Sequence, residues 1–79
     1  MMKLQIYATD DCPKCTAFRK NLKEAVKELN LDNNIERIDL EHAIKMNITS
    51  CPALIINGDI KSMGTLLSVE ELKEILKRE

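Results

Sequence analysis

The chain has 79 residues, of which 44% are hydrophobic and 32% are charged, and its formal net charge is −1. This length accommodates one domain, residues 1–79, with a composition typical of soluble globular proteins. A near-neutral chain with only two aromatic residues, Tyr7 and Phe18, has neither a basic surface nor a stacking platform, which argues against nucleic-acid binding. No apolar run is long enough to span a bilayer, and the first residues lack a secretory signal core. We therefore expect a cytoplasmic protein without membrane association.

The first third of the chain predicts a strand followed by a helix. Residues 3–8 alternate, with apolar side chains at Leu4, Ile6 and Ala8, which indicates a strand. Apolar residues then recur at three- and four-residue spacing, as in an amphipathic helix of roughly four turns: Cys15, Phe18, Leu22, Val26 and Leu29. Pro13 suits the first turn of this helix, where its missing N–H is not needed.

A second strand and a short helix are expected next. Residues 35–40 have a half-polar strand pattern that suits the edge of a sheet better than its centre. Residues 41–47 predict a short helix with three apolar side chains directed inward, namely Ala43, Ile44 and Met46. Residues 53–56 are the most strand-like run of the chain.

The last third predicts a hairpin and a capped helix. Asn57-Gly58 is a two-residue hairpin signal, because both central positions of that turn need a positive φ. Residues 60–63 would be the returning strand, and Gly64 ends it. Ser68 and Glu71 form a capping box, which opens a helix with one apolar face made of Val69, Leu72, Ile75 and Leu76. The order β-α-β-α-β-β-α predicts an α/β fold whose first two strands are parallel, in a four-stranded mixed sheet flanked by helices.

The candidate site is Cys12-Pro13-Lys14-Cys15, where the first strand gives way to the first helix. In a cytoplasmic protein such a pair is redox-active or metal-binding more often than it is a structural disulfide. Cys12 falls at the helix N-cap, where free N–H groups and the helix dipole favour a thiolate, and Lys14 adds a positive charge. We expect a thiol pKa at Cys12 below that of free cysteine. Cys12 would attack a disulfide, and Cys15, one turn further and facing inward, would resolve the mixed disulfide.

Together these elements and motifs resemble the thioredoxin superfamily along nearly the whole chain. The resemblance rests on the element order, on Cys12-Pro13-Lys14-Cys15 after the first strand, and on Thr49-Ser50-Cys51-Pro52-Ala53-Leu54 at the entry to the third. It is greatest to the short, glutaredoxin-sized "redox-active disulfide" proteins of archaea and anaerobic bacteria.

That resemblance implies the activity and its partners. It implies a monomeric thiol–disulfide oxidoreductase, without a cofactor, that acts on protein disulfides and is re-reduced by an upstream disulfide reductase. Pro52 would be a cis-proline, and the backbone of Cys51 would pair with an extended substrate. Pro13, Lys14 and Gly64 would complete the substrate-binding surface.

Two departures from the superfamily bear on mechanism and substrate. Thioredoxins have a buried acidic residue beneath the resolving cysteine, whereas the polar residues of the first strand here are Lys3, Gln5 and Tyr7. Glutaredoxins hold glutathione with a Gly-Gly pair followed by an acidic residue. Residues 64–68 here read Gly-Thr-Leu-Leu-Ser, which favours exchange with proteins over glutathione.

Cys51, the third cysteine, leaves an alternative open. The resemblance would bring it close to Cys12, so that Cys12, Cys15 and Cys51 could hold zinc, copper(I), an iron–sulfur centre or trivalent arsenic, or form a competing disulfide. The alternative function is therefore a small thiol protein that handles a soft metal or arsenic. The simpler interpretation of Cys51 is a small buried hydrophobic residue. A metal carrier of the ferredoxin-like fold is less consistent with the chain, because that fold ends in a strand and this sequence ends in a helical pattern.

Overall fold

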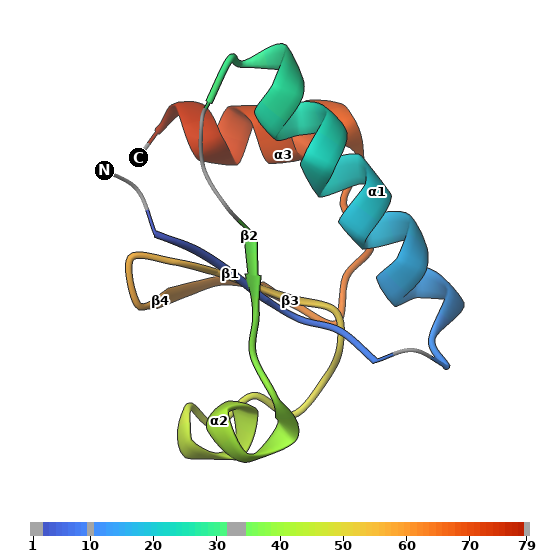
Figure 1. The fold of residues 1–79 in the computed structure, drawn as a ribbon, viewed down its shortest axis with the longest axis vertical. Coiled ribbons are helices and arrows are strands. Elements are labelled where there is room, and N and C mark those ends of the chain that lie inside the picture. The colour runs from blue at the N-terminus through green and yellow to red at the C-terminus, as the bar shows by residue number, and fades with distance from the viewer. Residues whose placement is uncertain (1–2, 10, 32–34, 79) are drawn as a thin grey trace.

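The computed structural model describes residues 3–9, 11–31 and 35–78, which form four strands and three helices in the described part of the chain (Figure 1). In chain order these are β1 (Leu4–Tyr7), α1 (Pro13–Glu28), β2 (Ile35–Arg37), α2 (Leu40–Lys45), β3 (Ala53–Ile56), β4 (Asp59–Met63) and α3 (Val69–Lys77). This is the predicted β-α-β-α-β-β-α order. Within the described ranges, no helix has both the length and the apolar content needed to cross a membrane.

The sheet has the strand order β2-β1-β3-β4. β1 pairs in parallel with β2 and antiparallel with β3, and β3 and β4 form an antiparallel hairpin. These pairings confirm the mixed four-stranded sheet, the parallel first pair and the edge position of β2. Figure 1 shows α1 and α3 over one face of the sheet and α2 over the other.

Each face of the sheet has its own apolar core. The larger core lies beneath α1 and α3 and includes Phe18, Leu22, Leu54, Leu72 and Leu76. The smaller core lies beneath α2 and consists of Ile38, Ala43, Ile48, Ala53 and Ile55. β3 is buried along its whole length because its alternate side chains enter the two cores in turn. This central strand follows the loop that carries Cys51, so the loop is attached to the most buried part of the sheet.

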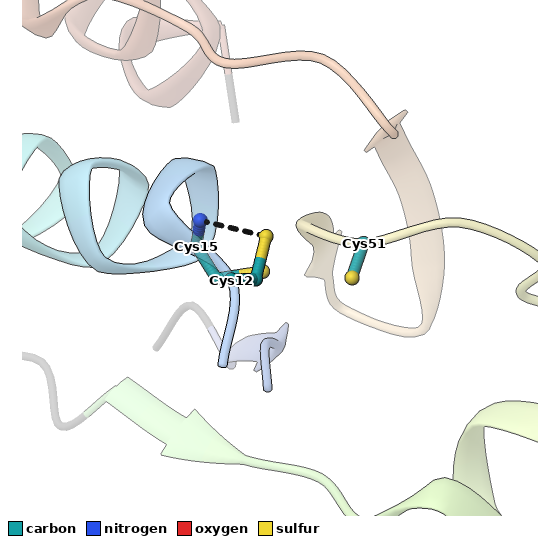
Figure 2. Close-up of side chains that lie close together, drawn as sticks. All are labelled: Cys12, Cys15 and Cys51. Carbon is teal, nitrogen blue, oxygen red and sulfur yellow. Dashed lines mark hydrogen bonds between the residues drawn. The ribbon is translucent and has the colours of Figure 1, made fainter. Parts of the chain in front are cut away.

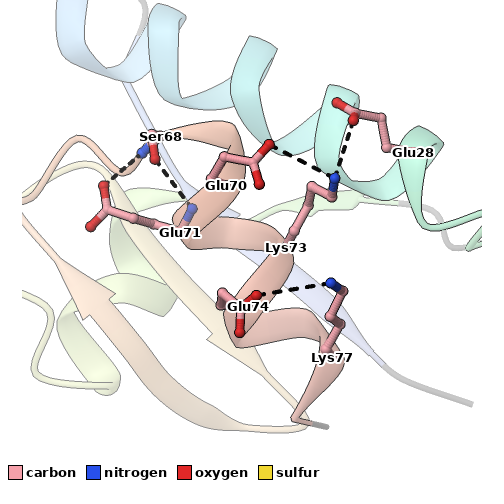
Figure 3. A network of polar contacts seen from close by, with 7 residues as sticks. All are labelled: Glu28, Ser68, Glu70, Glu71, Lys73, Glu74 and Lys77. Atoms are coloured by element: carbon pink, nitrogen blue, oxygen red, sulfur yellow. Dashed lines mark hydrogen bonds and ion pairs between the residues drawn. The ribbon is translucent and has the colours of Figure 1, made fainter.

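Local signals place the turns and the last helix as expected. Asn57 (φ 53°) and Gly58 (φ 86°) both adopt the positive φ of the predicted hairpin turn. The predicted capping box is present: Ser68 Oγ accepts a hydrogen bond from the Glu71 N–H, and the Glu71 carboxylate accepts one from the Ser68 N–H (Figure 3). Lys73 Nζ lies 3.2 Å from a carboxylate oxygen of Glu28, which links α3 to α1.

Two expectations about the second strand and the short helix are wrong. The strand ends at Arg37 and not at residue 40, because Asp39 caps α2 by accepting a hydrogen bond from the His42 N–H at 2.8 Å. Ile44, expected inward, is 62% exposed. Ala43 and Met46 are three residues apart and share the face of α2 that meets the smaller core, whereas Ile44 lies next to Ala43 in sequence and falls on another face.

Strand β1 also differs from its sequence pattern. Its polar residue Gln5 is buried, because β1 lies in the middle of the sheet and both of its faces are covered. The Gln5 side-chain amide donates a hydrogen bond to the Glu36 carboxylate on β2 at 3.1 Å. This bond satisfies a buried donor that would otherwise destabilise the folded state.

Candidate active site

Cys12 is the N-cap residue of α1, as the sequence predicts. Its backbone is extended (φ −109°, ψ 110°), and its Sγ accepts a hydrogen bond from the backbone N–H of Cys15 at 3.2 Å (Figure 2). Pro13 is the first helical residue, and the side chains of both Pro13 and Lys14 are exposed. The sulfur of Cys12 therefore lies at the open end of the helix, where it is partly accessible.

Hydrogen bonds lower the pKa of the Cys12 thiol from its ordinary value of 9.0. The largest contribution is the Cys15 side chain, followed by the Cys15 backbone N–H, and smaller ones come from the Cys51 side chain and the Lys14 backbone. Partial burial acts in the opposite direction. The direction of the shift is the one expected from the sequence. Its main cause is the neighbouring thiol, which the sequence argument did not include.

Cys15 has the opposite environment. It is fully buried and belongs to the larger core. Burial, and then hydrogen bonding to Cys12, raises the pKa of the Cys15 thiol to about 11, while a backbone hydrogen bond from Thr9 acts in the opposite direction. At neutral pH the Cys15 thiol is therefore protonated and can donate to the sulfur of Cys12. The structure thus separates the two thiols into an accessible, more acidic one and a buried, less acidic one.

Cys51 brings a third sulfur to the same place. It lies in the loop before β3, its peptide bond to Pro52 is cis, and its side chain is partly buried. The sulfur atoms of Cys12, Cys15 and Cys51 lie within 4.8 Å of one another (Figure 2). The hydroxyl oxygen of Thr9 lies 3.9 Å from the Cys51 sulfur, within hydrogen-bonding range for sulfur.

Gly64 lies against the Cys51–Pro52 loop. Its N–H donates a hydrogen bond to the Pro52 carbonyl at 2.8 Å. Its φ is +78°, and a Cβ built on it would approach the Cβ of Ser50 to 3.0 Å. Glycine is favoured here for both reasons, since most other residues rarely adopt this φ and Ser50 would have to shift to make room for the added carbon.

The structure therefore brings the predicted site residues into two adjoining groups. Cys12, Cys15 and Cys51 form the sulfur cluster. Pro52 and Gly64 lie beside it and are joined by the hydrogen bond from the Gly64 N–H to the Pro52 carbonyl. Pro13 and Lys14 lie exposed at the start of α1, next to Cys12. Sequence reasoning missed Thr9 and Ser50. Thr9 was visible only as the polar residue that follows the first strand, and Ser50 only as the neighbour of Cys51.

Comparisons with known proteins agree with this fold. Residues 2–77 match a family model described as "Thioredoxin domain". A thioredoxin of Methanothermobacter thermautotrophicus is 43% identical over 77 residues, covering 96% of this chain and 99% of the relative. A thioredoxin of Methanocaldococcus jannaschii is 35% identical over 77 residues, covering 98% and 88%.

Solved structures show the same fold at low sequence identity. One is thioredoxin-2, described as a component of malaria parasite protein secretion machinery, with a TM-score of 0.81 and 17% identity. The match covers 100% of this chain and 84% of that one. The family model and the archaeal relatives extend the likeness from fold to sequence, and they support thiol–disulfide oxidoreductase chemistry in general. The chain belongs to the thioredoxin family.

Proposed function

We propose that the protein exchanges disulfides with protein substrates through the dithiol of Cys12 and Cys15. The observation that carries this proposal is the unequal placement of the two sulfurs. Cys12 is accessible at the amino end of α1 and accepts the Cys15 N–H, whereas Cys15 is buried directly behind it. A thiolate is the attacking species in disulfide exchange, and the lowered pKa of Cys12 makes it the better nucleophile near neutral pH.

The reaction balances as two successive exchanges. The Cys12 thiolate attacks one sulfur of the substrate disulfide, forms a mixed disulfide and releases the other substrate sulfur as a thiolate, which takes up a proton. Cys15 then gives its proton to solvent and attacks the Cys12 sulfur. This leaves a Cys12–Cys15 disulfide and releases the second substrate sulfur as a thiolate, which takes up a proton. Two electrons pass from the dithiol to the substrate. Burial, and then hydrogen bonding to Cys12, raises the pKa of the Cys15 thiol, so Cys15 stays protonated near neutral pH and Cys12 is the first to attack.

The substrate would lie across the loop that carries the cis peptide bond. The backbone of Cys51 is proposed to pair with an extended substrate segment beside Pro52, and Gly64, Pro13 and Lys14 to border it. Support comes from the Gly64–Pro52 hydrogen bond and from the exposed side chains of Pro13 and Lys14 beside Cys12. Main-chain pairing of this kind accepts many sequences, which suits a general protein reductant.

The remaining parts of the proposal concern the setting of the reaction. We propose a cytoplasmic monomer that needs no cofactor and receives its electrons from an upstream disulfide reductase. Residues 64–68 lack the Gly-Gly-acidic pattern of glutathione sites. This supports a protein, and not glutathione, both as the electron donor and as the substrate.

A single-turnover measurement tests the proposed function. Pre-reduced protein is mixed with excess insulin, or separately with excess glutathione disulfide, and the reaction is quenched with acid at intervals. We expect each chain to reduce one insulin disulfide and to form a Cys12–Cys15 disulfide, at a rate well above that with glutathione disulfide. His42→Gln is a control on the opposite face of the sheet and should react like the unchanged protein. Failure to oxidise the dithiol with insulin, or faster reaction with glutathione disulfide, contradicts the proposal.

A further inference from the structure

The two-electron cycle exchanges electrons through two of the three sulfurs in the cluster, and the sulfur of Cys51 forms no bond in it. That sulfur lies within 4.8 Å of both Cys12 Sγ and Cys15 Sγ, although it comes from a different part of the chain (Figure 2). Among the described residues, these three form the one group of three or more His, Cys, Asp or Glu side chains close enough to hold a single ion. All three cysteines are free thiols.

We propose that Cys12, Cys15 and Cys51 together form a three-thiolate site for trivalent arsenic. The first argument is the number and kind of ligands. Thiolates select soft ions, and a structural zinc site is almost always closed by four protein ligands. The cluster offers three sulfurs, and no other such side chain in the described ranges joins them. Trivalent arsenic forms three bonds to sulfur and needs no fourth ligand.

The second argument is charge. Cys15 is fully buried in the larger core, and the other two sulfurs are partly buried. Placing a net charge in such a site is unfavourable unless it is compensated. Three thiolates around a trivalent ion form a neutral group, whereas the same thiolates around zinc or copper(I) keep one or two negative charges. The low polarity around Cys15 therefore favours the trivalent ion.

The third argument is geometry. Sulfurs bound to one ion through bonds of about 2.3 Å lie within about 4 Å of one another, so the cluster needs to contract by on the order of 1 Å. Cys12 and Cys51 are both partly exposed, and rotation about their Cα–Cβ bonds can supply this movement. The Thr9 hydroxyl, 3.9 Å from the Cys51 sulfur, is placed to orient that side chain.

The binding step needs no oxidant or reductant. Arsenous acid exchanges its three As–O bonds for three As–S bonds, and the three thiol protons leave with the three hydroxides as water. The arsenic and the sulfurs keep their oxidation states. Only the reduced protein can bind in this way, because a Cys12–Cys15 disulfide removes two of the ligands.

Arsenite itself is the probe for this site. Reduced protein, freed of reductant under anaerobic conditions, is titrated with arsenite and examined by non-denaturing mass spectrometry. We expect one arsenic per chain with the loss of three protons. A complex with only two thiols would keep one hydroxide on arsenic and would be heavier by the mass of one water molecule. That heavier species as the main product overturns the proposal, and this result does not depend on any variant.

Three matched variants locate the ligands. Cys12→Ser, Cys15→Ser and Cys51→Ser each leave two thiols, and each should weaken arsenite binding about 100-fold through the loss of one linked ligand. If Cys51→Ser binds arsenite as tightly as the unchanged protein, arsenic is held by the Cys12–Cys15 pair alone and the proposal is wrong. Tighter binding of zinc than of arsenite by the reduced protein also contradicts it. Circular dichroism of each variant checks that it is folded. The insulin reaction is measured without arsenite, so a failure of the proposed disulfide exchange can be told apart from a failure of the proposed arsenic site.

Discussion

The amino ends of α1 and α3 have the same capping geometry and different chemistry. At α1, Cys12 Sγ accepts the backbone N–H of Cys15 at 3.2 Å (Figure 2). At α3, Ser68 Oγ accepts the backbone N–H of Glu71, also at 3.2 Å (Figure 3). In both helices the cap residue binds the N–H three residues further on, so each sequence satisfies one of the helix's free donors with its own side chain.

The residues that follow each cap make the difference. In α3, Glu71 returns a hydrogen bond to the Ser68 N–H at 3.1 Å, and Glu70 adds a second acidic group at the positive end of the helix. The first turn of α1 has no acidic residue, and the position that corresponds to Glu71 is the buried Cys15. The same local structure thus stabilises the fold at α3, and at α1 leaves its N–H groups available to stabilise a thiolate.

Cys12→Ser makes the cap of α1 chemically like that of α3 and should have the largest effect. Disulfide exchange with insulin should fall to the uncatalysed rate, because a hydroxyl does not attack disulfides. The free energy of unfolding, measured by urea denaturation, should stay equal or rise, since serine is a preferred N-cap residue. Exchange that persists in this variant would show that another sulfur is the nucleophile.

The pH dependence of alkylation should separate the two cysteines of α1. Because the thiolate is the reactive form, a lowered pKa means that Cys12 reacts at lower pH, with a midpoint below 9.0. Cys15, with a pKa of about 11, should have a thiolate fraction at pH 7 at least about 100-fold smaller. Rates of iodoacetamide labelling, assigned to each cysteine by peptide mass, measure both.

The variant Cys15→Ala tests the cause of the lowered pKa at Cys12. It removes the thiol that makes the largest contribution, so the Cys12 midpoint should rise toward 9.0. Cys15→Ser keeps a hydroxyl donor and serves as the matched control. A midpoint unchanged in Cys15→Ala would assign the shift to the backbone N–H groups instead.

At α3, the variant Ser68→Ala should affect stability alone. Loss of the cap is expected to cost about 1 kcal/mol of unfolding free energy, because the Glu71 N–H loses its acceptor. The rate of insulin reduction by the folded protein should not change. Ser68→Thr keeps a hydroxyl cap and should recover most of the stability. Slower exchange in Ser68→Ala would mean that the two helix ends are not independent.

Lys14→Glu places an acidic residue in α1 at the position that Glu70 occupies in α3, and should have the smallest effect. A negative charge in the first turn disfavours a thiolate at the cap, so alkylation of Cys12 at pH 7 should slow roughly two- to fivefold. The effect should decrease with added salt. In Lys14→Gln, the rate of Cys12 alkylation should lie between those of the unchanged protein and Lys14→Glu. Glu70→Lys should leave this rate unchanged.

Most of the fold could be predicted because its signals are local. The Asn57-Gly58 turn, the Ser68 capping box and the apolar spacing along α1 each specify their own geometry. The end of β2 and the exposure of Ile44 were not predicted, because six residues of α2 give too short a pattern to fix its buried face. Burial of Gln5 could not be predicted either, since it depends on the central place of β1 in the sheet.

The candidate site divides in the same way. The N-cap position of Cys12 and the inward direction of Cys15 follow from the spacing of residues along one helix. The contact of Thr9 with Cys51, and the close approach of Gly64 to Ser50, join segments far apart in the sequence. No local sequence pattern predicts such contacts. For the same reason, the sequence did not predict that the Cys15 thiol is the main cause of the lowered pKa at Cys12.

Trapping of a reaction intermediate tests most directly whether Cys12 attacks and Cys15 resolves. Cys15→Ser is mixed with insulin, quenched with acid and analysed by peptide mass spectrometry, with the unchanged protein in parallel. We predict that a mixed disulfide between Cys12 and insulin accumulates in Cys15→Ser, while the unchanged protein accumulates the Cys12–Cys15 disulfide. A mixed disulfide carried by Cys51, or none at all in Cys15→Ser, would contradict the account.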